Sequence, residues 1–519
     1  MVSKVGTTPT TPAGPTVGVD PCKRCHRKVP VPVSAAVSRG EAFCGPCFDR
    51  FLSTKFRKQL GDESYKPLYL RDKTPVATTA RVVVPIRSHW TAGSKVEAGT
   101  ALVDMLVELI RVHRRGHRGR QGLYINVLEI VDDSAPVPVP ADGEAAWSLG
   151  GWLQQQYTDD EIESFKQIKL SDFFRSASHE LWDTIQIDKF DSASSLSVSA
   201  AGSDGSARPT SLNELLSVLP SKTSRADIIT IITQQLITDY AIATKSQSIF
   251  EPHTLTFMAE QSMALVCKGR GIELGTSILP FMSPANAASA ATAAAAGGGA
   301  APETVDVILA CKANAVKPVY TATDLVTLQP LCDLYDTEIK TYLALHDLKL
   351  PAHALLPTIA PGTNTKALSM DQLLHNYFST IDAAFPSVTT TVVRTIDKLA
   401  SKFDFSDFER AGSDAAAAGS TSIDAASAVA AAGDKKLPCR ICGTRREDDA
   451  LSWIHKISVM SLCEIDQPTP VLPVKLDGPQ DLCYGCITLF KNSAVSEVAW
   501  PSAASRGHSV EALLSEYEL

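Results

Sequence analysis

The sequence feature that most constrains the fold is the arrangement of cysteines in four C-x2-C pairs, two near each end of the chain. Eighteen residues separate the first two pairs and forty separate the last two, so each end can gather four thiolates around one tetrahedral metal ion. Without the apolar block of a signal peptide, such spacing indicates metal ligands rather than disulfides. Four sulfur ligands leave no open coordination position, and we therefore predict a structural Zn²⁺ at each end. The predicted ligands are Cys22, Cys25, Cys44 and Cys47, and Cys439, Cys442, Cys483 and Cys486.

The C-terminal set has two candidate substitutes, because the forty-residue gap also contains His455 and Cys463. We expect the closed four-cysteine site and keep these substitutes as the alternative. A RING-type arrangement is excluded, since it needs eight ligands interleaved in one short segment and the two sets here lie at opposite ends of the chain. Unliganded buried thiols are the competing interpretation at both ends.

The centre of the chain alternates between strand and helix patterns. A β-branched run at 82–86 predicts a buried strand, and the apolar positions at 100–110 lie on one face of a helix that follows it. Strands that alternate with helices form β-α-β units, so we predict an α/β fold with a parallel sheet. The further predicted elements are strands at 122–133 and 246–253 and helices at 225–244, 254–271 and 385–403, the last with Pro386 in its first turn.

Composition shifts along the chain predict its domain organisation. Segments rich in Ala, Ser and Gly cannot bury enough apolar area to offset chain entropy, and we expect them to be linkers or insertions. The predicted parts are a disordered tail at 1–20, a zinc module with a basic helix at 21–75, a central domain at 76–410 with insertions at 192–207 and 283–302, a linker at 411–434, and a second zinc module with a tail at 435–519.

The charge balance limits the classes of partner. Lysine and arginine total 49 against 57 aspartate and glutamate, a net charge of −8, which argues against a protein that binds nucleic acid through its overall charge. No run of about 18 strongly apolar residues is present, so we expect a soluble, cytoplasmic protein without a membrane partner.

Two local basic clusters are either phosphate-binding surfaces or solvated cations near helix ends. Their members are Arg111, Arg114, Arg115, Arg118 and Arg120, and Lys55, Arg57 and Lys58.

Several motifs together carry a family resemblance: "KFRKQLG" after the first cysteine module, "CKGRGIEL", "FPSVTTTVVRTIDKLAS", and the final "CRICG" and "CYGC". With these motifs the chain resembles the cytosolic thiouridylase subunit 2 family, also called cytoplasmic tRNA 2-thiolation protein 2. The resemblance implies a non-catalytic subunit of the tRNA thiolase complex and a catalytic partner, thiouridylase subunit 1. It further implies tRNA as the substrate, modified at wobble uridine 34 in the tRNAs for Lys, Gln and Glu, with sulfur from a ubiquitin-related modifier.

The same resemblance explains the loop that follows the first central strand. Active relatives carry S-G-G-x-D-S there, whereas this chain has Ser88 followed by His89 and Trp90 in place of the glycines and Ala92 in place of the aspartate. Side chains at the glycine positions obstruct both the tight turn and the approach of phosphate. We therefore expect a degenerate PP-loop ATP pyrophosphatase-like domain that binds no nucleotide.

A second nucleotide motif of the active relatives has also changed. Met258, Ala259 and Glu260 match it and His253 is kept, but its glycine, asparagine and acidic positions are replaced. We interpret the central domain as a pseudo-enzyme without catalytic residues. The replacing residues are Pro252, Thr254, Thr256 and Phe257.

The central cysteines give no sign of sulfur chemistry, because Cys267, Cys311 and Cys332 show no paired spacing. Cys267 lies in an apolar helix pattern, and we expect it to be a buried thiol. Two other functions stay open from the residues alone. One is a self-sufficient ATP-dependent tRNA thiolase, and the other is a zinc-module scaffold without an RNA role.

Overall fold

The computed structural model describes residues 21–26, 35–39, 41–60, 80–88, 96–116, 122–134, 148–175, 182–186, 209–274, 281–283, 325–350, 364, 368–400, 439–444, 482–491, 493 and 497–501. Several predictions fall outside these ranges. They are the loop residues His89, Trp90 and Ala92, the basic residues Arg118 and Arg120, Cys311, His455 and Cys463, the tail at 1–20, the segment 192–207, nearly all of 283–302 and the segment 411–434.

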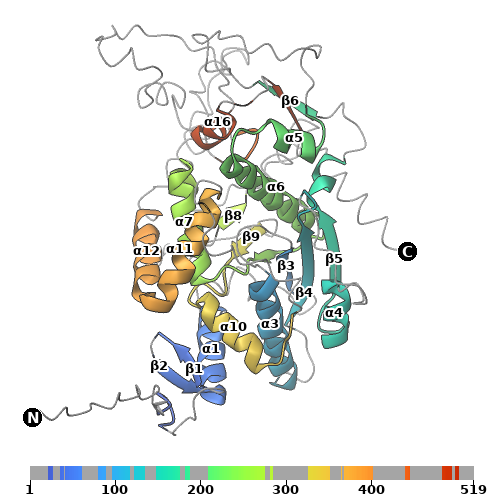
Figure 1. Ribbon diagram of the computed structural model, residues 1–519. Helices are drawn as coiled ribbons and strands as arrows, with labels where there is room; N and C mark the ends of the chain where they lie inside the picture. The colour runs from blue at the N-terminus through green and yellow to red at the C-terminus, as the bar shows by residue number, and fades with distance from the viewer. Residues whose placement is uncertain are drawn as a thin grey trace, which may run out of the picture.

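A six-stranded sheet forms the centre of the molecule, with the strand order β5-β4-β3-β7-β9-β8 (Figure 1). The first five strands are parallel, and β8 pairs antiparallel with β9 at one edge. The parallel α/β prediction is therefore confirmed. The strands are β3 (Ala80–Ser88), β4 (Leu123–Val131), β5 (Ser164–Lys169), β7 (Ser248–Phe250), β8 (Phe281–Ser283) and β9 (Leu325–Leu328).

The side chains of β3 alternate between two hydrophobic cores, as the pleat of a strand requires. Val82, Val84 and Ile86 pack in the core that contains α3 (Val96–Gly116), whereas Val83 packs in the core that contains α6 (Lys222–Ala243). Both faces of the sheet are thus covered by helices, which is why β3 is an almost continuous apolar run. The first core also contains residues of α4 (Leu149–Gln156), and the second contains η1 (Leu170–Phe174) and α5 (Leu212–Val218).

A separate group of helices packs beside the sheet. Helix α7 (Leu255–Cys267) lies against α11 (Met370–Ala384) and α12 (Pro386–Ala400), and the three share a third apolar cluster (Figure 1). Pro386 is the first residue of α12, because its missing N–H and fixed φ suit a first helical turn. Val393 and Ile396 are the buried residues of this helix within the third cluster.

The N-terminal module consists of a hairpin, β1 (Ala35–Ser38) and β2 (Glu41–Cys44), followed by α1 (Gly45–Leu60). Phe48, Leu52 and Phe56 of α1 belong to the same apolar core as α3 and α10 (Asp336–Leu345). The first cysteine module is therefore packed onto the central domain.

The C-terminal segment is also joined to the centre. Helix α16 (Tyr484–Phe490) contributes Ile487 and Phe490 to the core that contains α6, and β10 (Glu497–Pro501) pairs antiparallel with β6 (Trp182–Gln186). Trp500 is buried against Phe173 and Phe174 of η1. The short helix η3 (Gly271–Glu273) follows Arg270, which contacts Cys486 of α16. In the part of the chain that is described, no helix is long and apolar enough to cross a membrane.

Candidate metal centres and the carboxyl edge of the sheet

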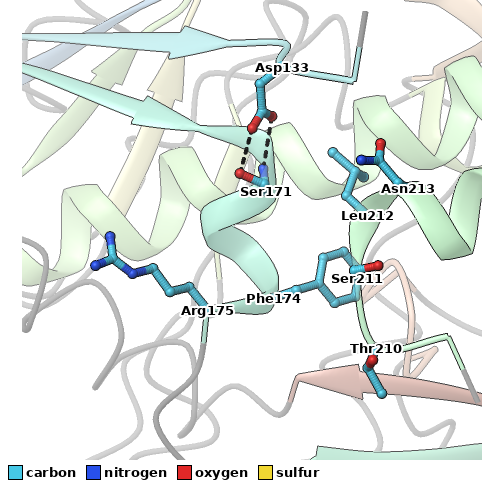
Figure 2. Close-up of a pocket in the computed structure, with 8 residues that line it drawn as sticks. All are labelled: Asp133, Ser171, Phe174, Arg175, Thr210, Ser211, Leu212 and Asn213. Carbon is cyan, nitrogen blue, oxygen red and sulfur yellow. Dashed lines mark hydrogen bonds between the residues drawn. The ribbon is translucent and has the colours of Figure 1, made fainter.

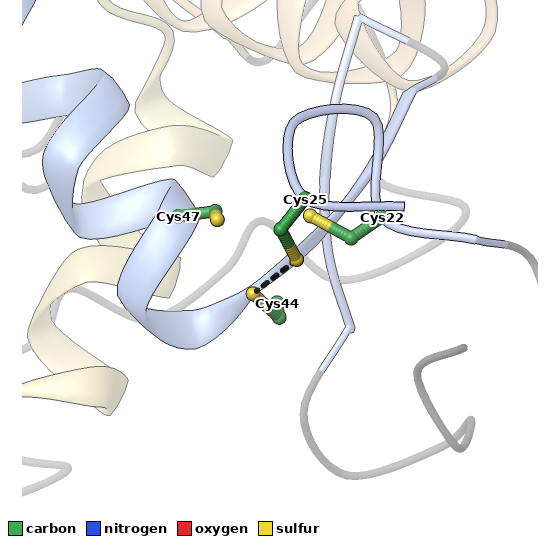
Figure 3. Close-up of side chains that lie close together, drawn as sticks. All are labelled: Cys22, Cys25, Cys44 and Cys47. Carbon is green, nitrogen blue, oxygen red and sulfur yellow. Dashed lines mark hydrogen bonds between the residues drawn. The ribbon is translucent and has the colours of Figure 1, made fainter. Parts of the chain in front are cut away.

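The N-terminal cysteines form a compact quartet, with all four Sγ atoms within 4.8 Å of one another (Figure 3). Cys22 and Cys25 lie on a turn in which the N–H of His26 donates to the carbonyl of Cys22 at 2.8 Å. His26 has a φ of 58°, so the backbone turns sharply after the second cysteine. Cys44 ends β2, and Cys47 lies in the first turn of α1. The sequence from 22 to 47 thus folds locally to converge four sulfur atoms.

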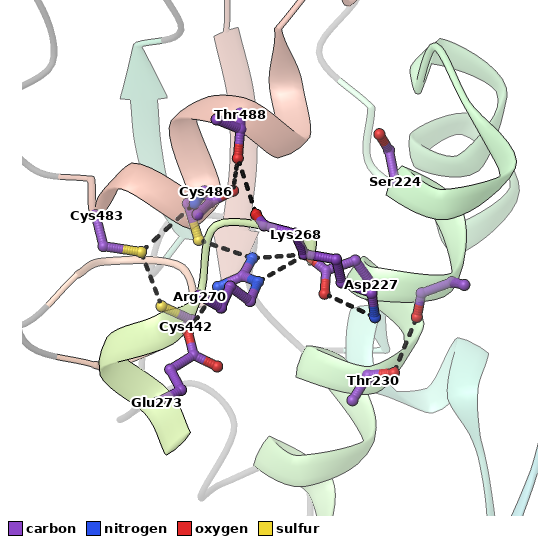
Figure 4. Close-up of polar contacts among 12 residues, drawn as sticks. Ser224, Asp227, Thr230, Lys268, Arg270, Glu273, Cys442, Cys483, Cys486 and Thr488 are labelled. Carbon is purple, nitrogen blue, oxygen red and sulfur yellow. Dashed lines mark hydrogen bonds and ion pairs between the residues drawn. The ribbon is translucent and has the colours of Figure 1, made fainter. Parts of the chain in front are cut away.

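The C-terminal quartet repeats this construction, and its four Sγ atoms also lie within 4.8 Å of one another. Figure 4 shows three of these cysteines, Cys442, Cys483 and Cys486. The N–H of Gly443 donates to the carbonyl of Cys439 at 2.8 Å, and Gly443 has a φ of 74° that suits a residue without Cβ. Cys483 caps α16, and its Sγ accepts the N–H of Cys486 at 3.4 Å. Three of these cysteines are buried, whereas Cys25 at the other end is exposed.

The donor sets fit a metal ion. Four converging thiolates suit Zn²⁺ and other metals that prefer sulfur. In the N-terminal quartet, burial raises the pKa of Cys22, but hydrogen bonds from the N–H groups of Cys25, Cys44 and Arg24 lower it to about 6. The hydrogen bond with the Cys44 thiol raises the pKa of Cys47 to about 12. Metal binding must therefore release protons from the quartet.

A glycine-flanked arginine without an assigned role lies against the C-terminal quartet. Arg270, in "CKGRG", is buried and directs Nη2 to Sγ of Cys486 at 3.6 Å. It also pairs with Asp227 of α6 at 2.7 Å and with Glu273 at 2.8 Å. Lys268 pairs with Asp227 at 3.4 Å and with Asp371 of α11 at 2.7 Å. Sequence reasoning missed these residues, and the two glycines that flank Arg270 were the available signal.

The carboxyl edge of the sheet contains a second polar cluster, formed by Arg87 of β3 with Glu251 and His253 after β7. Arg87 Nη1 lies 3.0 Å from Oε2 of Glu251 and 3.3 Å from Nε2 of His253, and Arg87 Nη2 lies 3.3 Å from Oε1 of Glu251. The order of the strands reverses between β3 and β7, and open parallel sheets bind ligands at such a switch point. Here a buried ion pair occupies that position.

The residues after β7 are used for internal contacts. Thr254 caps α7 by accepting the N–H of Phe257 at 3.2 Å, and its hydroxyl donates to Asp336 of α10. The Thr256 hydroxyl donates to Asp382 of α11, whose pKa is raised by burial. Phe257 is buried, with its ring 4.6 Å from that of His253. These side chains join α7 to α10 and α11.

The start of the strand-loop-helix unit agrees with the sequence prediction. Ser88 is the last residue of β3 and is buried, and its hydroxyl faces the carbonyl of Ile130 at 3.4 Å. The helix after the loop begins at Val96, so the order of strand, loop and helix is confirmed, while the loop residues lie outside the described ranges.

The predicted basic residues divide into two groups. Arg111 pairs with Glu161 at 2.6 Å and Glu108 at 2.7 Å, and the hydrogen bond that it donates to Glu161 raises the pKa of Arg111. Arg114 donates to the carbonyl of Asp160 at 2.5 Å. Lys55 lies 3.7 Å from buried Glu338 and donates to the carbonyl of Asp333 at 3.1 Å, so these three cations hold the fold together. The exposed members are Arg57, Lys58 and Arg115.

The prediction for one central cysteine is wrong. Cys267, the last residue of α7, is exposed rather than buried. Cys332 is half-buried against the third apolar cluster. In the described part of the chain, the two groups of metal-ligating side chains found are the terminal quartets.

A pocket lies beyond the carboxyl ends of β4 and β5 (Figure 2). On one side of it Asp133 accepts hydrogen bonds from the N–H and hydroxyl of Ser171, at 3.1 and 2.5 Å. Arg175 lies 3.9 Å from Asp172. The residues that line this pocket are Asp133, Ser171, Phe174, Arg175, Thr210, Ser211, Leu212 and Asn213.

Together, the fold and the cysteines define a class of protein: a parallel α/β protein with a tetrathiolate module packed at each end. A family model described as cytoplasmic tRNA 2-thiolation protein 2 matches residues 369–488, a segment that includes α11, α12 and the C-terminal quartet. Proteins of that name from Debaryomyces hansenii, Saccharomyces cerevisiae and Yarrowia lipolytica are 24%, 23% and 24% identical to this chain, respectively. Each match covers 96% of this chain. It covers 95%, 98% and 99% of the three relatives in the same order. The chain is thus similar over nearly its whole length to proteins of the cytoplasmic tRNA 2-thiolation protein 2 family, which confirms the resemblance seen in the sequence.

Among solved structures, the chain is similar to the U34-tRNA thiolase NcsA from Methanococcus maripaludis with its 4Fe-4S cluster. The TM-score is 0.40 and the identity 10%, over 86% of this chain and 99% of that one. A similarity this distant transfers neither a function nor a cofactor.

Proposed function

We propose that this protein is a non-catalytic subunit of a cytoplasmic tRNA thiolase complex, required for 2-thiolation of wobble uridine 34 in the tRNAs for Lys, Gln and Glu. Its catalytic partner is thiouridylase subunit 1, and sulfur reaches the complex from a ubiquitin-related modifier. The end-to-end similarity to relatives named for tRNA 2-thiolation supports the process. The observation that carries the non-catalytic role is that the described side chains at the carboxyl edge of the sheet pair with one another.

At that edge the groups a nucleotide would need are already in use. The guanidinium of Arg87 is neutralised by Glu251, which is 1% exposed, and a buried carboxylate repels phosphate. Thr254 and Thr256, at positions where active relatives have asparagine and an acidic residue, hydrogen-bond to Asp336 and Asp382. The central domain is therefore a degenerate PP-loop ATP pyrophosphatase-like domain within residues 76–410.

Each terminal quartet holds one structural Zn²⁺. The modules extend over residues 21–75 and 435–519, and the zinc ties together segments too small to fold alone. Four sulfur ligands leave no position for substrate, so the zinc would supply folding free energy and no chemical step. The exposed cations Arg57, Lys58 and Arg115 contact tRNA phosphates within the assembled complex.

The test combines ATP titration of the purified chain with measurement of 2-thiouridine in tRNA from cells. The chain should show no ATP binding up to millimolar concentration, yet its deletion should remove 2-thiouridine. Expressed in cells that lack the chain, the Ser88→Ala variant should restore thiolation fully, because the Ser88 hydroxyl contacts no ligand. The Cys22→Ser variant should not restore it, because the substitution unfolds the N-terminal module.

Micromolar ATP binding that is lost in Ser88→Ala or His253→Ala would contradict the proposal and favour a self-sufficient thiolase. Normal 2-thiouridine in cells without the chain would instead favour a zinc-module scaffold outside tRNA modification.

A further inference from the structure

The C-terminal quartet is in direct contact with an arginine that is 216 residues away in the sequence. Nη2 of Arg270 lies 3.6 Å from Sγ of Cys486, and both side chains are almost completely buried (Figure 4). At this distance a guanidinium N–H donates a hydrogen bond to sulfur.

Two carboxylates fix the orientation of this guanidinium. Asp227 Oδ2 accepts from Nε at 2.8 Å and lies 2.7 Å from Nη2, and Glu273 accepts from Nη1 at 2.8 Å. A planar guanidinium held on two sides cannot rotate, so the donor that faces Cys486 is fixed in position.

The packing of the helix that carries Cys486 depends on the same arginine. A Cβ on Gly485 would lie 2.6 Å from Cγ of Arg270 and 3.0 Å from Nη1, so the first turn of α16 rests on this side chain. Gly269 has a φ of 75°, and a Cβ there would lie 2.3 Å from the ring of Tyr484. The "CKGRG" and "CYGC" motifs are therefore complementary surfaces.

A divalent metal with four thiolates carries a net charge of −2, and burying that charge is costly unless donors and cations offset it. The N-terminal quartet reaches solvent through Cys25, which is exposed. Three cysteines of the C-terminal quartet are shielded from water, since Cys439, Cys483 and Cys486 are each at most 2% exposed, and the fourth, Cys442, is half-buried. The buried thiolates must obtain their hydrogen bonds from the protein, and Arg270 supplies one.

We propose that Arg270 is a positioning residue for the C-terminal metal site: its N–H stabilises the metal-bound thiolate of Cys486, and its pairing with Asp227 couples metal binding to the packing of α16 on α6. This role concerns the metal site alone and does not depend on the proposed role in tRNA thiolation. Groups that hydrogen-bond to metal ligands typically contribute 10- to 100-fold to metal affinity.

The experiment uses the full-length zinc-loaded protein and a competing chelator, with zinc release followed as the chelator concentration rises. Arg270→Met should release one of the two zinc ions at about 10- to 100-fold lower chelator activity. The N-terminal site should keep its zinc at the wild-type chelator concentration, and so serves as an internal control in the same chain. In the cobalt-substituted protein, the sulfur-to-cobalt charge-transfer band of the weakened site should shift, since one thiolate loses a hydrogen bond.

Further variants separate this role from a general loss of packing. Arg270→Met combined with Asp227→Asn and Glu273→Gln removes the carboxylates that would be left unpaired, and should still release zinc early. Arg270→Lys keeps the positive charge but lacks the planar guanidinium with its several N–H donors, and it should recover part of the zinc affinity that Arg270→Met loses. Thr488→Val breaks a 3.4 Å hydrogen bond to the carbonyl of Lys268 at the same junction without touching a thiolate, and should leave affinity unchanged.

Wild-type zinc retention and an unshifted cobalt band in the triple variant would overturn the proposal. Equal weakening of both zinc sites in Arg270→Met would also count against it, because that result would indicate global destabilisation. If Arg270→Met alone fails to fold, the triple variant decides the question.

Discussion

Asp104 shows at the residue scale how one buried carboxylate joins separate parts of the chain. Its oxygens accept hydrogen bonds from the hydroxyls of Tyr157 at 2.9 Å and Tyr342 at 2.7 Å. Burial, followed by the charge of Asp104, raises the pKa of both phenols, so they remain protonated donors over the physiological range. His346 lies 3.7 Å from the same carboxylate and 2.9 Å from Asp49 of α1. This polar network therefore links α1, α3 and α10.

We predict that Tyr342→Phe lowers the free energy of unfolding by about 1 to 3 kcal/mol, because it leaves one oxygen of a buried carboxylate without its donor. Denaturant unfolding of the full chain measures the change. Tyr377→Phe is the matched control, since Tyr377 is 53% exposed, and should change stability by less than about 0.5 kcal/mol. Equal effects in the two variants would contradict this account of Asp104.

The division of the basic residues gives a second prediction at this scale. Charge reversal of Arg57, Lys58 and Arg115 should weaken tRNA binding by the assembled complex. The salt dependence of binding should also fall, by about one unit of log slope for each phosphate that the protein no longer neutralises. The fold should be unaffected because these side chains are exposed.

Arg111→Glu is the contrasting variant. It places a third acidic side chain beside Glu108 and Glu161 and should destabilise the protein, as measured by thermal unfolding. Unchanged affinity and salt dependence in the triple reversal would return these cations to the role of a solvated surface.

At the element scale, the packing of α3 on β3 depends on a position without a side chain. A Cβ on Gly99 would lie 2.7 Å from Cγ1 of Ile86, closer than two carbon atoms can pack, so the helix approaches the strand directly at this residue. The same helix ends at Gly116, where an added Cβ would meet no atom within 4 Å. The two glycines therefore have different roles in one helix.

Gly99→Ala should destabilise the protein by about 1 to 3 kcal/mol, because overpacking forces α3 or Ile86 to shift. Gly116→Ala should be neutral or slightly stabilising, since alanine has the higher helix propensity. Thermal unfolding of the pair gives the comparison. A neutral Gly99→Ala would show that the helix can move away from the strand at little cost.

At the scale of the whole molecule, each cysteine module is continuous with a core of the central domain. Phe48 and Leu52 of the first module share a cluster with Leu102 and Leu106 of α3. Cys439 and Cys486 share a cluster with Ile228 and other residues of α6. Loss of either metal should therefore be felt by the sheet domain.

We predict that chelation of both zinc ions lowers the main thermal transition of the full chain, rather than producing separate unfolding of the two ends. Structural zinc supplies on the order of 10 kcal/mol in small modules, and part of that free energy supports the shared cores. Calorimetry with and without chelator, after elemental analysis has shown two zinc ions per chain, is the measurement. A main transition that stays unchanged after metal removal would indicate independent modules.

Local sequence patterns were sufficient to predict much of the architecture. Strand β3 could be predicted from its β-branched run at 82–86, and α3 from its apolar positions at a periodicity of 3.6 residues, because both are local patterns. The C-x2-C pairs could be assigned to quartets because two pairs lie at each end of the chain, and the Cys439–Cys442 knuckle is closed by a local bond from Gly443 to Cys439. Only the structure showed that Cys267 is exposed, because its position at the end of α7 depends on where that helix stops.

The sequence by itself determined the parallel α/β class, the two cysteine quartets and the resemblance to a family. Tertiary structure alone decided which charges face one another: Arg270 with Asp227 and Cys486, Arg87 with Glu251, and Lys55 with Glu338. The members of these pairs are between 43 and 283 residues apart, so no local periodicity links them. They meet because burying the apolar faces of the sheet and helices fixes where each element lies, and a buried charge is tolerated only where that packing brings its partner within reach.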